Sequence, residues 1–302
     1  MTVNARTITD NEYFYGHKAC AGCAGSLVVR QALKVLGPRT ICALPAGCMS
    51  AVGFNFPQLC FANNAFITPF AATASVLTGI RAGLEAQGED PDTFNVVGFA
   101  GDGGTADIGI QALSGAIDRN EDIIYICYDN EAYMNTGIQR SSSTPKFADA
   151  TTSPAGDEIP GKIQNKKNLT AIVAAHNVPY AAQTTFLGDF RDLHNKAHKA
   201  IYTKGACFLN VLAPCPRGWR YETEDLAEIC RLAVETCVWP LYEIEEGVWR
   251  LTYEPKKKLP VEEFLAKQGR FKHMFAKGSE WMIEETQEYV DRQWEELLSK
   301  CK

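Results

Sequence analysis

The apolar and polar positions of this chain alternate between two patterns from about residue 26 to residue 212. Short apolar runs, typical of strands buried on both faces, cover residues 40–44, 94–100, 122–129, 179–184 and 206–212. Segments with helical spacing lie between them, at residues 26–36, 70–87, 106–118, 167–176 and 190–202. Strands that alternate with helices in this way predict an α/β fold, a mostly parallel sheet with helices on both faces.

The pattern changes near residue 221. A helical segment at residues 223–237 is followed by a hairpin pattern, LYEIEEGVWRLTYE, and by a final amphipathic helix at residues 280–298. This part is long for a simple terminus and short for a separate domain. We therefore divide the chain into a domain at residues 1–220 and a helical and hairpin C-terminal extension at residues 221–302. We expect the extension to pack on the core or on a partner subunit.

Three other segments lack a regular pattern. Residues 1–15 have the character of an arm, residues 51–69 are irregular and aromatic, and residues 139–165 form a long polar loop. A loop of that length in a compact domain is usually functional, partner-facing or disordered. We favour the first two interpretations over plain disorder.

Composition and charge exclude several classes of protein. The chain of 302 residues is 46% hydrophobic and 22% charged, as in ordinary globular proteins, and its net charge of −6 argues against a nucleic-acid surface. No run of about 18 apolar residues marks a membrane span, and the polar start MTVNARTITDNEY lacks the pattern of a signal peptide. The eleven cysteines therefore fit reduced thiols in the cytoplasm, some of them bound to metal.

The stretch from Gly101 to Gln139 carries the strongest chemical signal. It begins with GDGG after one predicted strand, and Asn130 follows the next strand. Glycines let the backbone come close to a ligand, and the amides that open a helix favour an anion such as a diphosphate. Mg²⁺ takes oxygen ligands beside phosphates, which Asp102, Asn130 and the Ala132 carbonyl would supply. The alternative is a turn and a strand cap in an ordinary nucleotide-binding sheet.

Four cysteines have the setting of metal ligands. Cys20 and Cys23 form a CxxC pair in a loop of small residues, and Cys48 and Cys215 each follow a predicted strand. Four thiolates can hold a zinc ion or an iron–sulfur cluster. Structural zinc sites usually combine two close pairs, whereas here one pair is joined by two distant single residues, so we favour a cluster. The alternative is a loop with incidental cysteines.

Taken together, these residues resemble the β subunit of the 2-oxoacid:ferredoxin oxidoreductases, the pyruvate:ferredoxin oxidoreductase group in particular. The resemblance covers about residues 16–219 and rests on GHKACAGC, AGC, GDGGTADIG, YDNEAYMNTG with Gln139, and APCPRGW, in this order. A GDG with a downstream Asn also resembles the diphosphate-binding motif of thiamine diphosphate enzymes. The resemblance implies a thiamine diphosphate-binding fold for residues 1–220.

The resemblance also implies how three cofactors are bound. One [4Fe-4S] cluster would be held by Cys20, Cys23, Cys48 and Cys215. Thiamine diphosphate and Mg²⁺ would be held by Gly101, Asp102, Gly103, Gly104, Asn130, Glu131, Ala132, Tyr133, Met134 and Asn135, with Cys48 beside them. Asn135 would reach towards the substrate and is the catalytic candidate.

The activity that the resemblance implies is the oxidative decarboxylation of a 2-oxoacid. Thiamine diphosphate serves as an electron sink when CO₂ leaves, and electrons pass one at a time through the cluster to ferredoxin. Pyruvate is the commonest substrate, with coenzyme A as the acceptor of the acetyl group. Two other classes stay open: a zinc-stabilised scaffold subunit with a degenerate cofactor fold, and a non-redox thiamine decarboxylase subunit.

Two features of the family are missing from this chain. Thiamine diphosphate needs a Glu at its aminopyrimidine ring, which the α subunit supplies in the family. The chain also has no C-x2-C-x2-C-x3-C run for onward clusters. We therefore expect an obligate hetero-oligomer with an α subunit and with γ/δ-type subunits that carry further [4Fe-4S] clusters. Neither nucleic acid nor a membrane is expected as a partner.

One segment departs from the pattern of the family. Its β chains usually read close to PYTAW and FENAA after the third cysteine, whereas this chain reads FPQLCFANNAFITPFAATAS. That region lies near the cofactor in the family. Oxalate, branched-chain 2-oxoacids and 2-oxoglutarate therefore stay open as alternatives to pyruvate.

Overall fold

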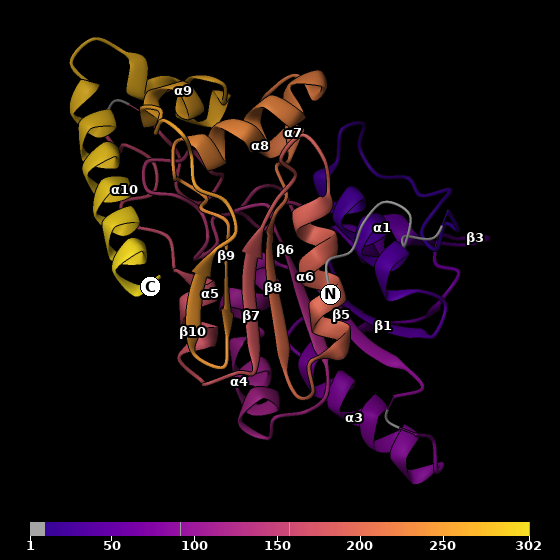
Figure 1. Cartoon of the computed structure of the whole chain (residues 1–302). Coiled ribbons are helices and arrows are strands. Elements are labelled where there is room, and N and C mark those ends of the chain that lie inside the picture. Colours follow the sequence, from indigo (N-terminus) through magenta and orange to yellow (C-terminus); the bar gives the residue numbers. More distant parts are fainter. Residues whose placement is uncertain (1–9, 91, 157, 302) are drawn as a thin grey trace.

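The protein is built on an eight-stranded sheet with the strand order β10-β9-β7-β8-β6-β5-β1-β4 (Figure 1). The computed structural model describes residues 10–90, 92–156 and 158–301. All neighbours from β7 to β4 run parallel. These parallel strands are β1 (Thr40–Pro45), β4 (Asn64–Thr68), β5 (Asn95–Gly101), β6 (Ile124–Asp129), β7 (Tyr180–Thr184) and β8 (Cys207–Leu212). The predicted mostly parallel sheet is confirmed.

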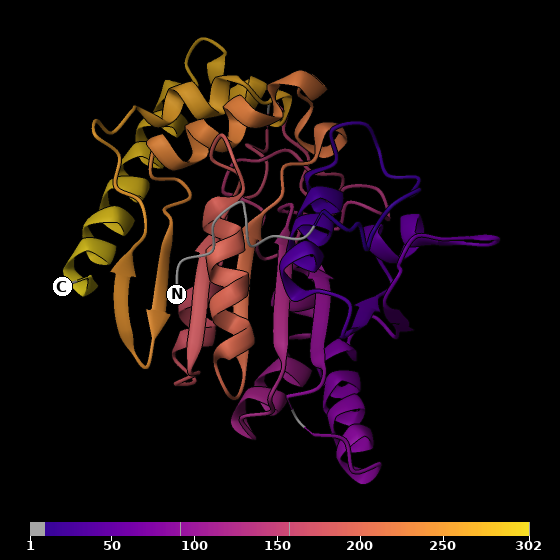
Figure 2. The same ribbon diagram turned by 45° about the vertical axis from the view of Figure 1, so that its right-hand side comes forward.

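Helices cover both faces of this sheet, as the sequence predicts (Figure 2). One face carries α1 (Ala24–Leu36) and α6 (Arg191–Tyr202), and the other carries α3 (Thr73–Ala86), α4 (Ile110–Asp118) and α5 (Leu169–Ala174). Successive side chains of a strand point to opposite faces. In β5, Val97 and Phe99 therefore join the core beneath α1, while Val96 and Ala100 join the core beneath α3 and α4. This burial on both sides explains the apolar runs in the sequence.

Residues 221–302 extend the sheet and cover one end of it. β9 (Tyr242–Glu245) and β10 (Val248–Leu251) form the expected hairpin, and β9 pairs antiparallel with β7. Further helical elements surround a third apolar core near the carboxyl ends of the parallel strands. They are α7 (Pro216–Trp219), which precedes the extension, and η2 (Thr223–Asp225), α8 (Leu226–Glu235), α9 (Val261–Ala266), η3 (Gly269–Phe275) and α10 (Glu280–Lys300) within it. The boundary at residue 220 stays a prediction.

Two local expectations about residues 16–69 were wrong. Residues 51–69, expected to be irregular, contain the short hairpin of β2 (Phe54–Asn55) and β3 (Gln58–Leu59) and the strand β4. β4 is the edge strand, and its sequence NAFIT holds only a short apolar run, Ala65 to Ile67, in which Phe66 and Ile67 are exposed. α1 begins at Ala24, two residues before the predicted start at residue 26, and Cys23 is its N-cap residue.

Most of the arm expected at residues 1–15 lies outside the described residues. In its described part, Phe14 is buried and forms a bridge with Phe61. Among the helices that the structure describes, none has both the length and the apolar character needed to span a membrane.

Candidate functional site

The candidate site lies where β5 and β6 end, at the centre of the sheet. Gly101 pairs with Tyr128 in the parallel register, so Asp102 and Asp129 leave the two strands side by side. Both carboxylates are fully buried. The chain after Asp102 first forms a π-helix, η1 (Gly103–Asp107), and α4 begins only at Ile110, four residues later than the sequence predicts.

Three oxygen-bearing groups converge at this point, and they are the three that the sequence suggests for Mg²⁺. One terminal atom of the Asn130 amide lies 2.9 Å from Asp102 Oδ1 and 2.8 Å from the Ala132 carbonyl oxygen. If that atom is the nitrogen, it donates a hydrogen bond to each. If it is the oxygen, three oxygens meet and need a cation between them. Neighbouring ligand oxygens of an octahedral Mg²⁺ are about 2.9 Å apart, so these residues fit the ion.

The electrostatics of Asp102 also fit a cation. Burial raises the pKa of the Asp102 carboxyl well above its usual range, and the negative charge of Asp129 adds to this effect. A carboxylate in such a position is costly to ionise without a positive partner. A bound divalent ion would supply that partner and keep Asp102 charged.

A cavity of 130 Å³ opens beside these oxygens. Its lining comes from the turn after β1, from the end of β5 and from the loop after β6: Ala46, Gly47, Cys48, Phe70, Gly101, Gly103, Gly104, Tyr128, Asn130, Ala132, Tyr133, Met134, Asn135 and Thr136. A Cβ at Gly101 would lie 3.2 Å from the Tyr128 ring, and one at Gly104 would lie 3.0 Å from Phe70. The glycines therefore keep the wall of the cavity open where a diphosphate would approach the backbone.

The four candidate cysteines gather next to this cavity. Cys48 lines it, and burial raises the pKa of the Cys48 thiol, with further contributions from Cys23, Cys215 and Cys20 in that order. The thiols are therefore close enough to interact electrostatically. Among the described residues, no three His, Cys, Asp or Glu side chains have the spacing of ligands to a single metal ion. Thiolates around a four-iron cluster are farther apart than those around one ion.

The loop after β6 links the cysteines to the cavity. Cys215 Sγ accepts a hydrogen bond from the Gly218 amide at 3.4 Å. Met134, which lines the cavity, packs directly on Gly218. Trp219, the next residue, donates its indole N–H to the Asn130 carbonyl at 2.8 Å. Packing and hydrogen bonds thus join the turn after Cys215 to the loop after β6, although the two segments are far apart in the sequence.

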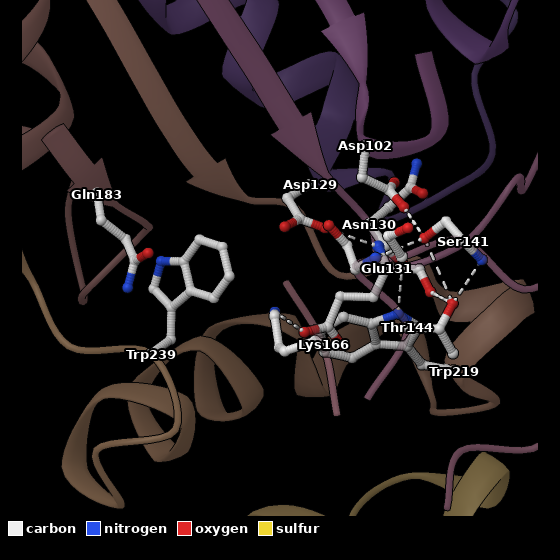
Figure 3. A network of polar contacts seen from close by, with 12 residues as sticks. Asp102, Asp129, Asn130, Glu131, Ser141, Thr144, Lys166, Gln183, Trp219 and Trp239 are labelled. Atoms are coloured by element: carbon white, nitrogen blue, oxygen red, sulfur yellow. Dashed lines mark hydrogen bonds and ion pairs between the residues drawn. The ribbon is translucent and has the colours of Figure 1, made fainter. Parts of the chain in front are cut away.

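Several residues of the site were not found from the sequence (Figure 3). The Ser141 hydroxyl donates to Asp102 Oδ2, and Thr144 Oγ1 donates to the Glu131 carbonyl at 2.6 Å. Both belong to the long polar loop at residues 139–165, where a run of hydroxyl residues was the available signal. The Glu131 carboxylate, expected near the cofactor, is bound by Lys166 and Arg270 instead of facing the cavity. Nothing in the sequence marked either cation.

Comparison with known proteins agrees with this geometry. Residues 27–211 match the family described as thiamine pyrophosphate enzyme, C-terminal TPP binding domain. The pyruvate synthase subunit PorB of Methanothermobacter thermautotrophicus is 48% identical over 282 residues, which cover 93% of this chain and 96% of that protein. The ketoisovalerate oxidoreductase subunit VorB of Pyrococcus horikoshii is 46% identical over 293 residues, covering 95% and 93%.

A solved structure supports the fold. The 2-oxoglutarate:ferredoxin oxidoreductase from Magnetococcus marinus aligns with a TM-score of 0.58 and 20% identity over 77% of this chain and 84% of that chain. Its low identity limits this comparison to the fold, whereas the two sequence relatives span nearly the whole chain. The chain belongs to the thiamine pyrophosphate enzymes and, among them, to the family of PorB and VorB subunits of the 2-oxoacid:ferredoxin oxidoreductases.

Proposed function

We propose that this chain is the β subunit that binds thiamine diphosphate, Mg²⁺ and one [4Fe-4S] cluster in an enzyme for oxidative decarboxylation of a 2-oxoacid. One observation carries the proposal: the convergence of Asp102, Asn130 and the Ala132 carbonyl at the rim of a glycine-walled cavity that Cys48 also lines. Thiamine diphosphate, when bound, supplies the electron sink for decarboxylation. The protein binds the cofactor, orients it and keeps it next to an electron acceptor.

The residues of this chain divide into two sets of ligands. Asp102, Asn130 and Ala132 would bind Mg²⁺, and the backbone at Gly101–Gly104 would receive the diphosphate. Cys20, Cys23, Cys48 and Cys215 would bind the cluster; the contribution of the other three thiols to the raised pKa of Cys48 supports the placement of all four near one another. The shared position of Cys48 would bring the two cofactors together.

The open side of the cavity would receive the substrate. Asn135 is exposed and lines the cavity, which supports its role as the group that reaches the substrate. Pyruvate is the first substrate to test and ketoisovalerate the second, since the relatives carry these names. In the pyruvate reaction coenzyme A would take the acetyl group, giving acetyl-CoA and CO₂, and ferredoxin would take the electrons.

Partner chains would complete the site. The exposure of Asn135 leaves room for an α subunit that supplies the activating Glu. The β2–β3 hairpin projects from the molecule (Figure 2). Large apolar side chains are exposed on this hairpin and on β4, namely Phe56, Leu59, Phe66 and Ile67. Further subunits with [4Fe-4S] clusters would carry electrons onward. All eleven cysteines are unpaired, which suits the reducing cytoplasm.

Dye reduction by the assembled complex tests this proposal. The chain is produced anaerobically with its partner chains, and viologen reduction is measured with pyruvate, ketoisovalerate, 2-oxoglutarate and oxalate. We expect a brown complex whose visible absorbance bleaches with pyruvate. Cys48→Ser should remove the cluster absorbance and dye reduction, while Cys301→Ser, at the far end of α10, should change neither. A colourless zinc-containing complex, or decarboxylation that survives Cys48→Ser, would contradict the proposal.

A further inference from the structure

Glu131 has an unusual backbone conformation at the centre of the candidate site. Its φ is +64°, in the left-handed region that residues with a Cβ seldom adopt. It stands between Asn130 and Ala132: the Asn130 side-chain amide lies 2.9 Å from Asp102 Oδ1 and 2.8 Å from the Ala132 carbonyl oxygen. The backbone turn at Glu131 therefore sets the directions of two of the three groups that converge there.

Four contacts hold Glu131 in this conformation. Its amide donates to Asp129 Oδ1 at 3.0 Å, and its carbonyl accepts from Thr144 Oγ1 at 2.6 Å. Its carboxylate is bound by Lys166 Nζ at 2.6 Å through one oxygen and by Arg270 Nη2 at 2.6 Å through the other. A left-handed residue persists where its surroundings determine it in this way. Figure 3 shows Glu131 between Asp129, Thr144 and Lys166.

Arg270 is the member of this set that belongs to the C-terminal extension. It lies on η3, and its side chain is only 3% exposed. Its guanidinium also lies over the Trp219 ring, with Cζ 3.8 Å from the ring centroid. Its Nε donates a hydrogen bond to Gln268 Oε1 at 2.9 Å. Since Trp219 donates to the Asn130 carbonyl, Arg270 supports Asn130 as well as Glu131.

A purely structural role would not explain why the ion pair of Glu131 and Arg270 lies at this left-handed turn. Glycine would adopt the left-handed conformation without strain, yet this chain has a glutamate whose carboxylate is 1% exposed. A buried carboxylate is tolerated because Arg270 and Lys166 balance its charge. The glutamate thus makes the turn dependent on a cation from the C-terminal extension.

We propose that Arg270 is a positioning residue for the cofactor site: it fixes the turn at Glu131, which holds the Asn130 amide next to Asp102 and the Ala132 carbonyl next to that amide. Residues that orient metal ligands from behind typically contribute about 10- to 100-fold to metal affinity. The inference rests on the proposed function, because it assigns Arg270 to the binding of Mg²⁺ and thiamine diphosphate. It makes the C-terminal extension part of the cofactor site.

The test is cofactor binding by the assembled complex, measured by calorimetry after removal of the cofactors with a chelator. Arg270→Gln should weaken Mg²⁺-dependent thiamine diphosphate binding by about tenfold or more. The maximal rate should recover when both cofactors saturate. Arg250→Gln is the matched control, because Arg250 belongs to the same extension and pairs with Glu245 at 3.0 Å on the surface. Its binding constant should equal that of the wild type.

A second variant pair separates positioning from general stability. Adding Glu131→Gly to Arg270→Gln should restore part of the lost affinity, because glycine forms the left-handed turn without a counter-ion. A merely structural role predicts a further loss instead. Arg270→Lys keeps the charge without the planar fork, so it should remain folded and bind the cofactor more weakly than the wild type but better than Arg270→Gln.

The outcomes are distinct. If the wild-type complex itself does not bind thiamine diphosphate, the proposed function fails. If the wild type binds and a folded Arg270→Gln or Arg270→Lys complex, with an unchanged circular dichroism spectrum, binds equally well, the positioning role is refuted. The role is also refuted if the glycine variant lowers affinity further. Should Arg270→Gln not assemble, the comparison of Arg270→Lys with Arg250→Gln decides the question.

Discussion

Gly103→Ala adds a single methyl group to the wall of the cavity proposed for the cofactor. A Cβ at this position would lie 2.5 Å from Cε1, 2.6 Å from Cδ1 and 2.8 Å from Cζ of the Tyr133 ring. All three distances are well inside van der Waals contact, so the ring must move. Tyr133 lines the cavity next to Ala132, and any displacement changes the space that the cofactor would occupy.

The free energy of unfolding should fall, because the losses exceed the gain. An alanine in a helical segment gains up to about 1 kcal/mol over glycine. Overpacking costs about 1–3 kcal/mol. The displaced ring also loses the hydrogen bond from its hydroxyl to Asp107 Oδ2 at 3.1 Å, which contributes about 1 kcal/mol. The net expectation is a destabilisation of about 1–3 kcal/mol, together with at least about tenfold weaker cofactor binding.

Thermal melting and calorimetric titration with thiamine diphosphate measure the two effects. Gly79→Ala is the matched control: it lies in α3, and a Cβ there meets no atom within 4 Å. We expect this control to stabilise the fold by about 0.5–1 kcal/mol and to bind the cofactor normally. A Gly103→Ala protein that melts and binds like the control would refute the close packing of Tyr133 on the GDG turn.

Two further substitutions test other parts of the structure. In Gly218→Ala the new methyl group would overlap Met134 Sδ and disturb the turn that follows Cys215. The cluster absorbance per protein should therefore fall. An unchanged absorbance spectrum would argue against a cluster at this turn. Glu12→Gln removes a surface ion pair: hydrogen bonds from Arg30 lower the pKa of Glu12 from 4.5 to about 2. Because the pKa is lower in the folded state, the wild type should exceed this variant in stability above pH 4.5, by no more than about 1 kcal/mol for an exposed pair. The difference in stability between the wild type and the variant should vanish as the pH falls towards 2. Melting curves across this pH range measure it, and a difference that does not change with pH would contradict the pairing.

The convergence of Asp102, Asn130 and Cys48 at one end of the sheet could be predicted because its signals are local. Asp102 and Asn130 each follow an apolar strand, and the carboxyl ends of neighbouring parallel strands meet at one rim. Cys48 lines the cavity for the same reason. In each case the residue type and the preceding strand were enough.

The contacts that hold Glu131 in its conformation could not be predicted, because they depend on tertiary packing. Arg270 lies 139 residues from Glu131 along the chain, and no periodicity connects them. The left-handed turn at Glu131 was also hidden, since that conformation usually marks glycine or asparagine in a sequence. β4 escaped detection because its apolar run, Ala65 to Ile67, is shorter than that of a central strand.

The central claim is that Asp102, Asn130 and Ala132 bind a divalent cation beside a diphosphate. Mn²⁺ in place of Mg²⁺ makes this directly measurable, because electron–nuclear double resonance detects phosphorus close to the bound ion. We predict that the assembled complex binds Mn²⁺ with a ³¹P coupling that appears only when thiamine diphosphate is added. Asp102→Ala should abolish the signal, whereas Asp118→Ala, at an exposed position of α4, should retain it. A ³¹P coupling that persists unchanged in Asp102→Ala would contradict the account.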